Sequence, residues 1–328
     1  MLRTVKARLR SVTGGSKILA SAYAGLSGIK ADLLSVLPDS VYLRMKYRLS
    51  TGLTLELEHP RRFNEKLQWM KLYDHNPLYT EIVDKYRVRQ YVAERIGEEH
   101  LIPLLGAWDS AEEINFDLLP DQFVLKCNHN SGKGMCICRK KSELNYEEAR
   151  RELTKGLKEN YYYKGREWPY KNVKRKIIGE KFLSGDGKAL DDYKVHCFSG
   201  EPRIILVCRD RFSKQGVSED FFSPQWERLP LRRPGVRICD HEIARPEELE
   251  EMLRLSRMLS EGFPFLRTDF YIVDHRVYFG ELTLFPGDGF GRFDPDEYDL
   301  ILGDWLNLGE QTKQNDGTAA DAAYSGNN

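Results

Sequence analysis

The sequence predicts an α+β protein in which antiparallel hairpins and helices occur along one chain of 328 residues. Residues 121–138, 191–208 and 269–283 each contain two β-prone runs joined by a short polar or glycine-containing segment, which is typical of β-hairpins. Residues 63–73, 84–97 and 246–259 carry apolar side chains at helical spacing, and 146–160 predicts a charged helix. A chain of this length has room for two or three packed subdomains.

The composition argues against several classes of partner. The chain has 50 basic and 50 acidic residues and a formal net charge of +0, so no overall field favours nucleic acid, and we expect none as a partner. Six cysteines are scattered and lie mostly in apolar runs, which indicates reduced thiols in a cytoplasmic protein. No apolar run approaches the roughly 18 residues of a membrane span.

The two ends differ from the middle of the chain. Residues 1–60 predict a basic helical N-terminal extension, and residues 1–31 contain six Lys and Arg but no acid. Two interpretations remain open for them: a solvated helix, which we favour, or a segment lying peripherally on the inner face of an anionic membrane. Glycines and polar residues interrupt the apolar stretch at 18–29, which argues against a cleaved signal peptide. The polar tail at 309–328 is expected to be disordered.

Residues 61–120 predict a subdomain of two helices followed by a short strand at 101–108. Lys85 lies at the expected start of the second helix, where a basic side chain opposes the helix dipole. A bound phosphate is one explanation for this mild cost.

Residues 121–138 read as a strand, a glycine-rich loop and a second strand. Lys126 closes the first strand, and residues 131–134 (Ser-Gly-Lys-Gly) form a loop whose backbone N–H groups can point at phosphate oxygens. The glycine spacing is not that of a Walker loop, and ordinary hairpins use the same residues. A zinc site is the less favoured alternative, and its ligands would be Cys127, His129, Cys136 and Cys138.

Two further segments carry candidate nucleotide contacts. Glu180 lies on a strand that breaks at 185–187, and it and the following backbone suit a hinge that hydrogen-bonds an adenine, or else Glu180 is a lone glutamate on an edge strand. Asp192 and Lys194 alternate onto one face of the next hairpin, where they suit ribose and phosphate contacts or a plain ion pair. The Arg- and Pro-rich segment 209–240 predicts an irregular surface or substrate-side loop.

The last hairpin carries the candidate metal site. A three-residue turn at 274–276 would place Asp269 directly opposite Glu281, with Cβ atoms roughly 5 Å apart and Thr283 on the same face. Two carboxylates at that distance repel each other unless a cation lies between them. A two-residue turn would instead pair Asp269 with Gly280. The alternative is a solvated polar face on a surface hairpin.

These segments occur in an order that resembles the ATP-grasp superfamily. Residues 63–69 (Phe-Asn-Glu-Lys-Leu-Gln-Trp), 123–129 (Phe-Val-Leu-Lys-Cys-Asn-His), 192–194 (Asp-Tyr-Lys) and 278–283 (Tyr-Phe-Gly-Glu-Leu-Thr) are more closely similar to the TupA-like ATP-grasp family, named from teichuronopeptide biosynthesis. The resemblance covers about residues 40–308. It implies two α+β lobes whose antiparallel sheets enclose ATP, with a small lobe at 121–185 and a catalytic lobe at 186–308.

The resemblance also implies roles for single residues. The residues expected to bind ATP are Lys85, Lys126, Ser131, Gly132, Lys133, Gly134, Glu180, Lys181, Phe182, Leu183 and Asp192. Asp269, Glu281 and Thr283 are expected to hold Mg²⁺, although many relatives have Asn at the position of Thr283. Arg267 and Lys194 are the expected catalytic residues, which would stabilise the transferred phosphoryl group.

The implied activity is an ATP- and Mg²⁺-dependent ligase that joins a carboxylate to an amine through an acylphosphate, with release of ADP. The family context favours a uronic acid or acidic polymer of a surface or capsular polysaccharide as the carboxylate substrate. A kinase that phosphorylates a sugar hydroxyl is the alternative. A glycosyltransferase is less favoured, because nothing in the sequence looks like an Asp-x-Asp sugar-nucleotide site on a Rossmann-like sheet. A non-catalytic nucleotide-binding protein is also less favoured, because the acidic pair is retained.

Overall fold

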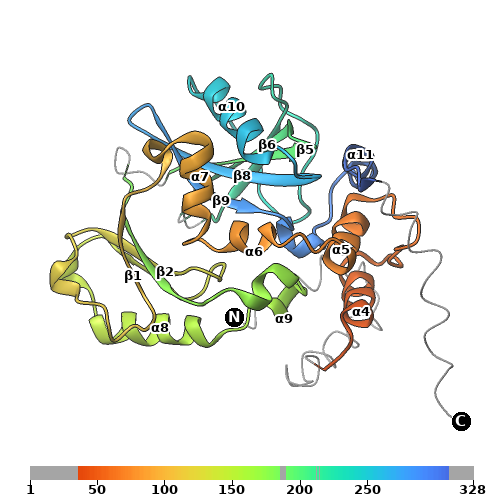
Figure 1. Cartoon of the computed structure of the whole chain (residues 1–328). Coiled ribbons are helices and arrows are strands. Elements are labelled where there is room, and N and C mark those ends of the chain that lie inside the picture. The colour runs from red at the N-terminus through yellow and green to blue at the C-terminus, as the bar shows by residue number, and fades with distance from the viewer. Residues whose placement is uncertain (1–35, 185–189, 212, 214, 310–328) are drawn as a thin grey trace, which may run out of the picture.

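Two antiparallel sheets organise the protein in the computed structural model, which describes residues 36–184, 190–211, 213 and 215–309 (Figure 1). The smaller sheet has the strand order β1-β4-β2-β3, and the larger has the order β7-β6-β5-β8-β9. The strands of the smaller sheet are β1 Leu104–Trp108, β2 Phe123–Cys127, β3 Met135–Cys138 and β4 Ile177–Lys181. Those of the larger sheet are β5 Asp192–Phe198, β6 Glu201–Arg209, β7 Ser218–Phe222, β8 Phe265–Val273 and β9 Arg276–Thr283.

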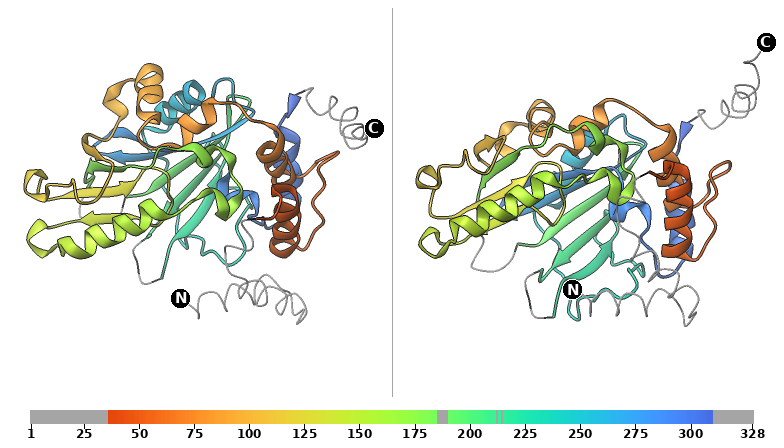
Figure 2. Two further views of the ribbon diagram at one scale, coloured as in Figure 1. Left: turned by 60° about the horizontal axis from the view of Figure 1, so that its bottom comes forward. Right: turned by 90° about the horizontal axis from the view of Figure 1, so that it is seen from below.

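The helices surround these sheets in three groups. The α-helices are α4 Asp39–Thr51, α5 Phe63–Tyr73, α6 Leu78–Val83, α7 Val88–Ile96, α8 Tyr146–Lys158, α9 Tyr162–Gly165, α10 Leu249–Ser260 and α11 Glu297–Trp305. The 3₁₀ turns are η1 Glu98–His100, η2 Phe116–Leu118, η3 Lys141–Glu143, η4 Trp168–Asn172 and η5 Pro286–Gly289. Figures 1 and 2 show α8 along the smaller sheet, α10 on the larger sheet, and α4, α5 and α11 together at one side. Within the described residues, no helix is both long and apolar enough to cross a bilayer.

Each sheet has its own buried core. Ala149 and Leu153 of α8 pack with Leu125 of β2 and Ile177 of β4 in the smaller core. The larger core joins α10 to β5, β6 and β8, and there the Ser256 and Thr268 hydroxyl groups hydrogen-bond at 2.8 Å. Because side chains alternate across a strand, the residues on either side of Thr268 face away from α10. That other face of the larger sheet is the one that carries the charged residues of the candidate site.

The expected helices and hairpins form, with two differences. The helix expected at 84–97 begins only at Val88, because the Asp84 carboxylate accepts hydrogen bonds from the backbone N–H groups of Tyr86 and Arg87 and holds a turn there. Lys85 therefore lies in the turn between α6 and α7, and the helix-dipole argument for it was wrong. The segment 209–240, expected to be irregular, contains the edge strand β7.

The predicted segment boundaries stay predictions. The segment 61–120 contributes β1, which pairs with β4 of the smaller sheet through Trp108 opposite Ile177. Residues 1–35 and 310–328, the targets of the membrane-surface and disordered-tail predictions, lie outside the described residues.

Candidate active site

The β8–β9 hairpin reaches the expected pairing by an unexpected route. Its turn has two residues, Asp274 and His275, both with positive φ (50° and 57°), and Val273 pairs with Arg276. The predicted three-residue turn was therefore wrong. A two-residue turn alone would pair Asp269 with Gly280, but the register shifts between positions 269 and 270.

Gly280 is the extra residue of this β-bulge, since Phe270 pairs with Phe279 while Asp269 pairs with Glu281. A Cβ atom on Gly280 would lie 3.1 Å from the backbone oxygen of Asp269 and 3.0 Å from the ring of Tyr271. A side chain at this position would therefore collide with the partner strand. The bulge brings Glu281 to the same face as Asp269.

A guanidinium lies between the two carboxylates. Arg267 donates from Nε to Oδ1 of Asp269 at 2.6 Å and from Nη2 to Oδ2 at 2.7 Å, and the same Nη2 reaches Oε1 of Glu281 at 3.1 Å. Asp269 is only 1% exposed, and both of its oxygens are occupied. Thr283 pairs with Arg267, two residues away from the Asp269–Glu281 pair on each strand.

Alternating charges continue from this group across the sheet. Lys194 of β5 forms ion pairs with Asp269 and, at 2.8 Å, with Asp192. Asp192 also pairs with Arg211, and at the other end Lys85 lies 3.6 Å from Glu281. Asp192 and Lys194 thus share a face, as their spacing predicts.

The smaller sheet faces this network with a second charged group. Lys126 of β2 forms an ion pair with Glu180 of β4 at 2.6 Å, and Arg89 of α7 lies 3.4 Å from the same carboxylate. Lys85 donates to the backbone oxygen of Asn130 at 3.0 Å, so it connects the glycine-rich loop with Glu281. The resemblance implies that Lys126 contacts the phosphates and Glu180 the adenine, but in this structure the two side chains form an ion pair with each other.

A cavity of about 510 Å³ lies between the two sheets. Thirteen predicted site residues line it: Lys85, Lys126, Ser131, Gly132, Lys133, Glu180, Lys181, Phe182, Leu183, Asp192, Lys194, Arg267 and Glu281. The other three, Gly134, Asp269 and Thr283, do not line it. Gly134 closes the β2–β3 hairpin, where its oxygen accepts from the Cys127 N–H at 2.8 Å.

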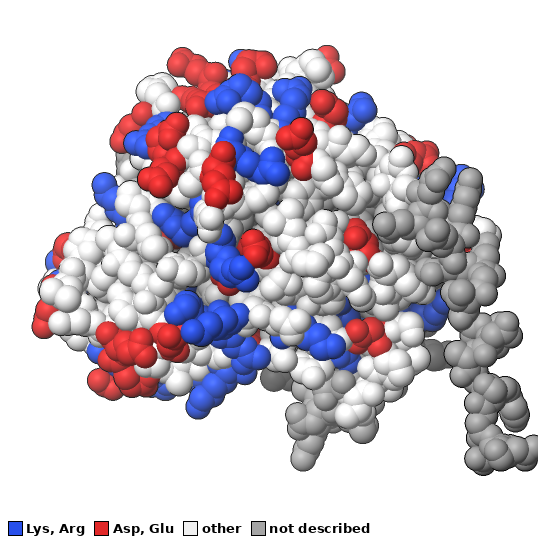
Figure 3. All heavy atoms as spheres, viewed as in Figure 1, with Lys and Arg blue, Asp and Glu red and all other residues white. Residues whose placement is uncertain are grey.

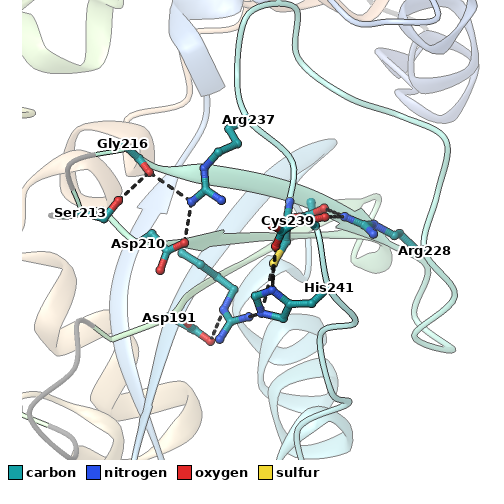
Figure 4. Close-up of polar contacts among 11 residues, drawn as sticks. Asp191, Asp210, Ser213, Gly216, Arg228, Arg237, Cys239 and His241 are labelled. Atoms are coloured by element: carbon teal, nitrogen blue, oxygen red, sulfur yellow. Dashed lines mark hydrogen bonds and ion pairs between the residues drawn. The ribbon is translucent and has the colours of Figure 1, made fainter.

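Sequence reasoning missed several cavity residues. The guanidinium of Arg139 stacks on Phe182 at 5.1 Å, and Arg211, Glu219 and Tyr271 also line the cavity. Tyr271 had a signal, because it is two residues from Asp269 on the same strand face. Arg211 and Glu219 lie in the 209–240 segment. Three of the six arginines of that segment pair with acids within it, for example Arg237 with Asp210 (Figure 4), and the other three pair with acids outside it.

The donor set suits a magnesium ion. Burial disfavours the ionised form of Glu281, but the charges of Lys85, Arg267 and Lys194 outweigh it and lower the pKa to about 2. Oδ1 of Asp192 is buried and has no hydrogen-bond partner among the described residues. Carboxylate oxygens are the ligands that Mg²⁺ prefers, so an ionised Glu281 and an unsatisfied acceptor in one cavity fit such an ion.

The alternative zinc set does not assemble. His129 bonds the backbone oxygen of Glu159 at 3.0 Å, and Cys127 is buried against the end of α8. In the part of the chain that the structure describes, two other groups of three His, Cys, Asp or Glu side chains have their ligand atoms within 4.8 Å of one another. One lies at 239–241, and the other consists of Glu247, Glu248 and His275. Both lie away from the cavity-lining residues.

The family model described as TupA-like ATPgrasp matches residues 65–307, which is most of the chain. The chain belongs to the TupA-like ATP-grasp family. The predicted family is therefore confirmed, and with it the ATP-grasp fold of ATP-dependent ligases. No curated protein matches the chain.

Solved structures similar to this TupA-like protein are distant. A D-alanine–D-alanine ligase from Bacillus anthracis, complexed with ATP, has 15% identity and a TM-score of 0.40 over 70% of this chain and 65% of its own length. The D-cycloserine synthetase DcsG has 13% identity and a TM-score of 0.42 over 70% and 71%. The ATP-grasp ligase PsnB, complexed with a minimal precursor, has 12% identity and a TM-score of 0.36 over 67% and 60%.

Proposed function

We propose that this protein is an ATP- and Mg²⁺-dependent ligase that joins a carboxylate to an amine through an acylphosphate. The observation that carries the proposal is the cavity between the sheets, where Lys85, Lys126, Lys194 and Arg267 converge around the ionised Glu281. Converging cations in a partly closed cavity stabilise phosphoryl transfer without reorganising during the reaction.

In this proposal the nucleotide lies along the predicted ATP-binding residues. Residues 180–183 and the stacked Arg139 border the adenine, and Asp192 contacts the ribose. Lys126, Lys85 and the N–H groups of residues 131–134 neutralise the phosphates. Binding of ATP would therefore replace the ion pairs that Lys126 and Lys85 make with Glu180 and Glu281.

Glu281 would hold Mg²⁺. Asp269 lies opposite Glu281 on the neighbouring strand β8. The ion would supply positive charge to the phosphate oxygens. Asp269 becomes a direct ligand only if Arg267 releases one of its oxygens, so its role in the unliganded protein is to orient the guanidinium. A ligand role for Thr283 stays a proposal with less support, because Thr283 does not line the cavity.

The chemistry needs no protein nucleophile. A carboxylate oxygen of the substrate attacks the γ-phosphorus, the bond to the bridging oxygen breaks, and ADP leaves. The amine nitrogen then attacks the acyl carbon, phosphate leaves, and the amine releases one proton. Cys127 and Cys208 line the cavity, but burial raises the pKa of each thiol to about 12, so neither is a thiolate at neutral pH.

For the carboxylate substrate we propose a uronic acid or an acidic polymer of a surface polysaccharide. The amine would be an amino acid or amino alcohol. The resemblance to a family named from teichuronopeptide biosynthesis supports this choice, and the requirement for ATP supports a cytoplasmic location.

Phosphorus NMR with ATP, Mg²⁺ and uronic acid–amine pairs tests the proposal. We expect ADP and phosphate to form only when both the acid and the amine are present. A stable phosphoester would identify the kinase instead, and AMP with pyrophosphate would rule out the acylphosphate. Glu281→Gln should abolish turnover while Glu247→Gln, at a carboxylate whose side chain is 86% exposed, should not. Normal turnover of Glu281→Gln would refute the site.

A further inference from the structure

We propose that a basic surface formed by the end of α8, by α9 and by η4 binds a polyanionic glycan chain and guides it to the cavity. This inference rests on the proposed function, because it concerns the same substrate class. The surface is defined by the cations Lys155, Lys158, Lys164, Lys171, Lys174, Arg175 and Lys176. Figure 3 shows Lys and Arg side chains gathered over this part of the molecule, below its centre.

The sequence that forms this surface is strongly basic within a neutral chain. Residues 155–176 contain eight basic residues and only two acids, Glu159 and Glu167, whereas the whole chain has 50 of each. Lys158, Lys171 and Lys174 are exposed, and within the described residues neither Lys158 nor Lys171 forms an ion pair. The potentials of exposed charges add where the charges lie within about one Debye length of one another, roughly 8–10 Å at physiological salt.

One of the two acids does not offset this charge. Glu167 is 4% exposed, and burial raises its pKa to about 8, partly opposed by Lys71 and supported by Asp288. At neutral pH Glu167 is therefore mostly protonated. Arg166 is also buried, so seven cations remain on the surface. Three acids offset part of their charge: Glu159, Glu152, which pairs with Lys155, and Asp109, which pairs with Lys174 and Lys176. Seven cations against three acids leave the surface net positive.

Glu159 connects the basic surface to the cavity. Its side chain pairs with Lys133 of the glycine-rich loop at 3.2 Å, and its backbone oxygen is bonded by His129. Lys133 lines the cavity and is exposed at its edge. A chain bound along α8 and η4 would therefore reach the cavity without crossing uncharged surface.

The ring of Tyr163, 43% exposed beside these cations, suits contact with a sugar face. A polymer with one carboxylate per sugar matches cations that are spread over a helix end, a turn and a strand entry. We therefore commit to a polycarboxylate glycan as the partner.

The test is direct binding of a fluorescein-labelled oligogalacturonate of about ten sugars, followed by anisotropy. We expect the wild type to bind, with an affinity that falls as NaCl rises from about 50 to about 200 mM. Lys158→Gln, Lys171→Gln and Lys174→Gln in one protein should weaken binding about tenfold or more. The matched control removes three exposed arginines near α10, with Arg245→Gln, Arg254→Gln and Arg257→Gln, and should change binding less than about twofold.

Three results would overturn the inference. The first is that the triple lysine variant binds the oligomer as tightly as the wild type does. The second is that the arginine control weakens binding as much as the lysine variant does. The third is that the wild type binds single-stranded DNA or phosphatidylserine vesicles more tightly than oligogalacturonate, and that the lysine variant loses this binding.

Turnover separates this inference from the proposed function. If the lysine variant loses affinity for the oligomer but keeps wild-type turnover of a monomeric uronic acid, both proposals are supported. Loss of oligomer binding in the variant, with no turnover of any acid–amine pair by the wild type, would support the surface and reject the ligase. If the lysine variant binds the oligomer as the wild type does and turnover is normal, the ligase is supported and the surface is rejected.

Discussion

Replacing Gly280 by alanine tests whether the β-bulge sets the geometry of the candidate site. The bulge is what brings Glu281 opposite Asp269 despite a two-residue turn. The new Cβ atom would lie 3.1 Å from the Asp269 backbone oxygen and 3.0 Å from Tyr271, whereas ordinary contacts begin at about 3.4 Å. The Tyr271 ring is the nearest group and the Asp269 backbone oxygen the next. Because backbone cannot rotate aside as a ring can, β9 has to move by a few tenths of an ångström or the bulge has to shift.

The size of the effect follows from this overlap. Overpacking of this kind costs about 1–3 kcal/mol, and each kcal/mol corresponds to about 2–4 °C in a domain of roughly this size. We expect the melting temperature to fall by about 2–12 °C. Glu281 directly follows the bulge and moves with it. A displacement of about 1 Å would reduce turnover on the order of 100-fold, and the few tenths of an ångström required here should reduce it by less than that.

The assay compares Gly280→Ala with Gly291→Ala by thermal unfolding and by calorimetric titration with Mg²⁺–ADP. Gly291 is a matched control, because a Cβ atom there meets nothing within 4 Å. We expect only Gly280→Ala to lose both stability and Mg²⁺-dependent nucleotide affinity. If it keeps both at the level of the control, the bulge does not position Glu281 and the register argument fails.

Three further predictions follow from the charges of the site and its surroundings. Glu281→Gln should lower the Mg²⁺-dependent part of the affinity for ADP at least about tenfold, as measured by calorimetry. Because the pKa of Glu281 is about 2, its carboxylate stays ionised, and the wild type should keep that affinity from pH 8 to about pH 5. Cys208→Ala should leave turnover within about twofold of wild type, and a loss of turnover would reopen covalent catalysis. Burial raises the pKa of Glu167 to about 8. Between about pH 4.5 and pH 8 the folded state therefore binds more protons than the unfolded state, and the free energy of unfolding falls as pH rises. Urea midpoints at pH 5 and pH 8 should show this fall in wild type, and Glu167→Gln should reduce it.

Local patterns predicted much of the fold. Helical spacing located α5, α8 and α10 to within a few residues, and β-prone runs around short turns located all three hairpins. Alternation along a strand placed Asp192 and Lys194 on one face, where they form an ion pair. These predictions succeeded because both periodicities are properties of the backbone alone.

The pairing of Asp269 with Glu281 was predicted correctly from a wrong turn. The sequence does not distinguish a three-residue turn from a two-residue turn followed by a bulge, since both insert one residue into the same strand. Gly280 was the available signal, because an isolated glycine in a strand often marks a bulge.

Periodicity and motifs in the sequence were enough to predict most elements, the order of the motifs and the family to which they belong. The contacts between charges became visible only in the folded protein: Arg267 lies between two carboxylates, Lys126 pairs with Glu180, and Lys85 reaches both the glycine-rich loop and Glu281. Lys126 and Glu180, and Lys85 and Glu281, lie far apart in the chain, and their long side chains meet through packing that no local period encodes. The bulge at Gly280 is the smallest example, where one residue without a side chain sets the face on which Glu281 lies.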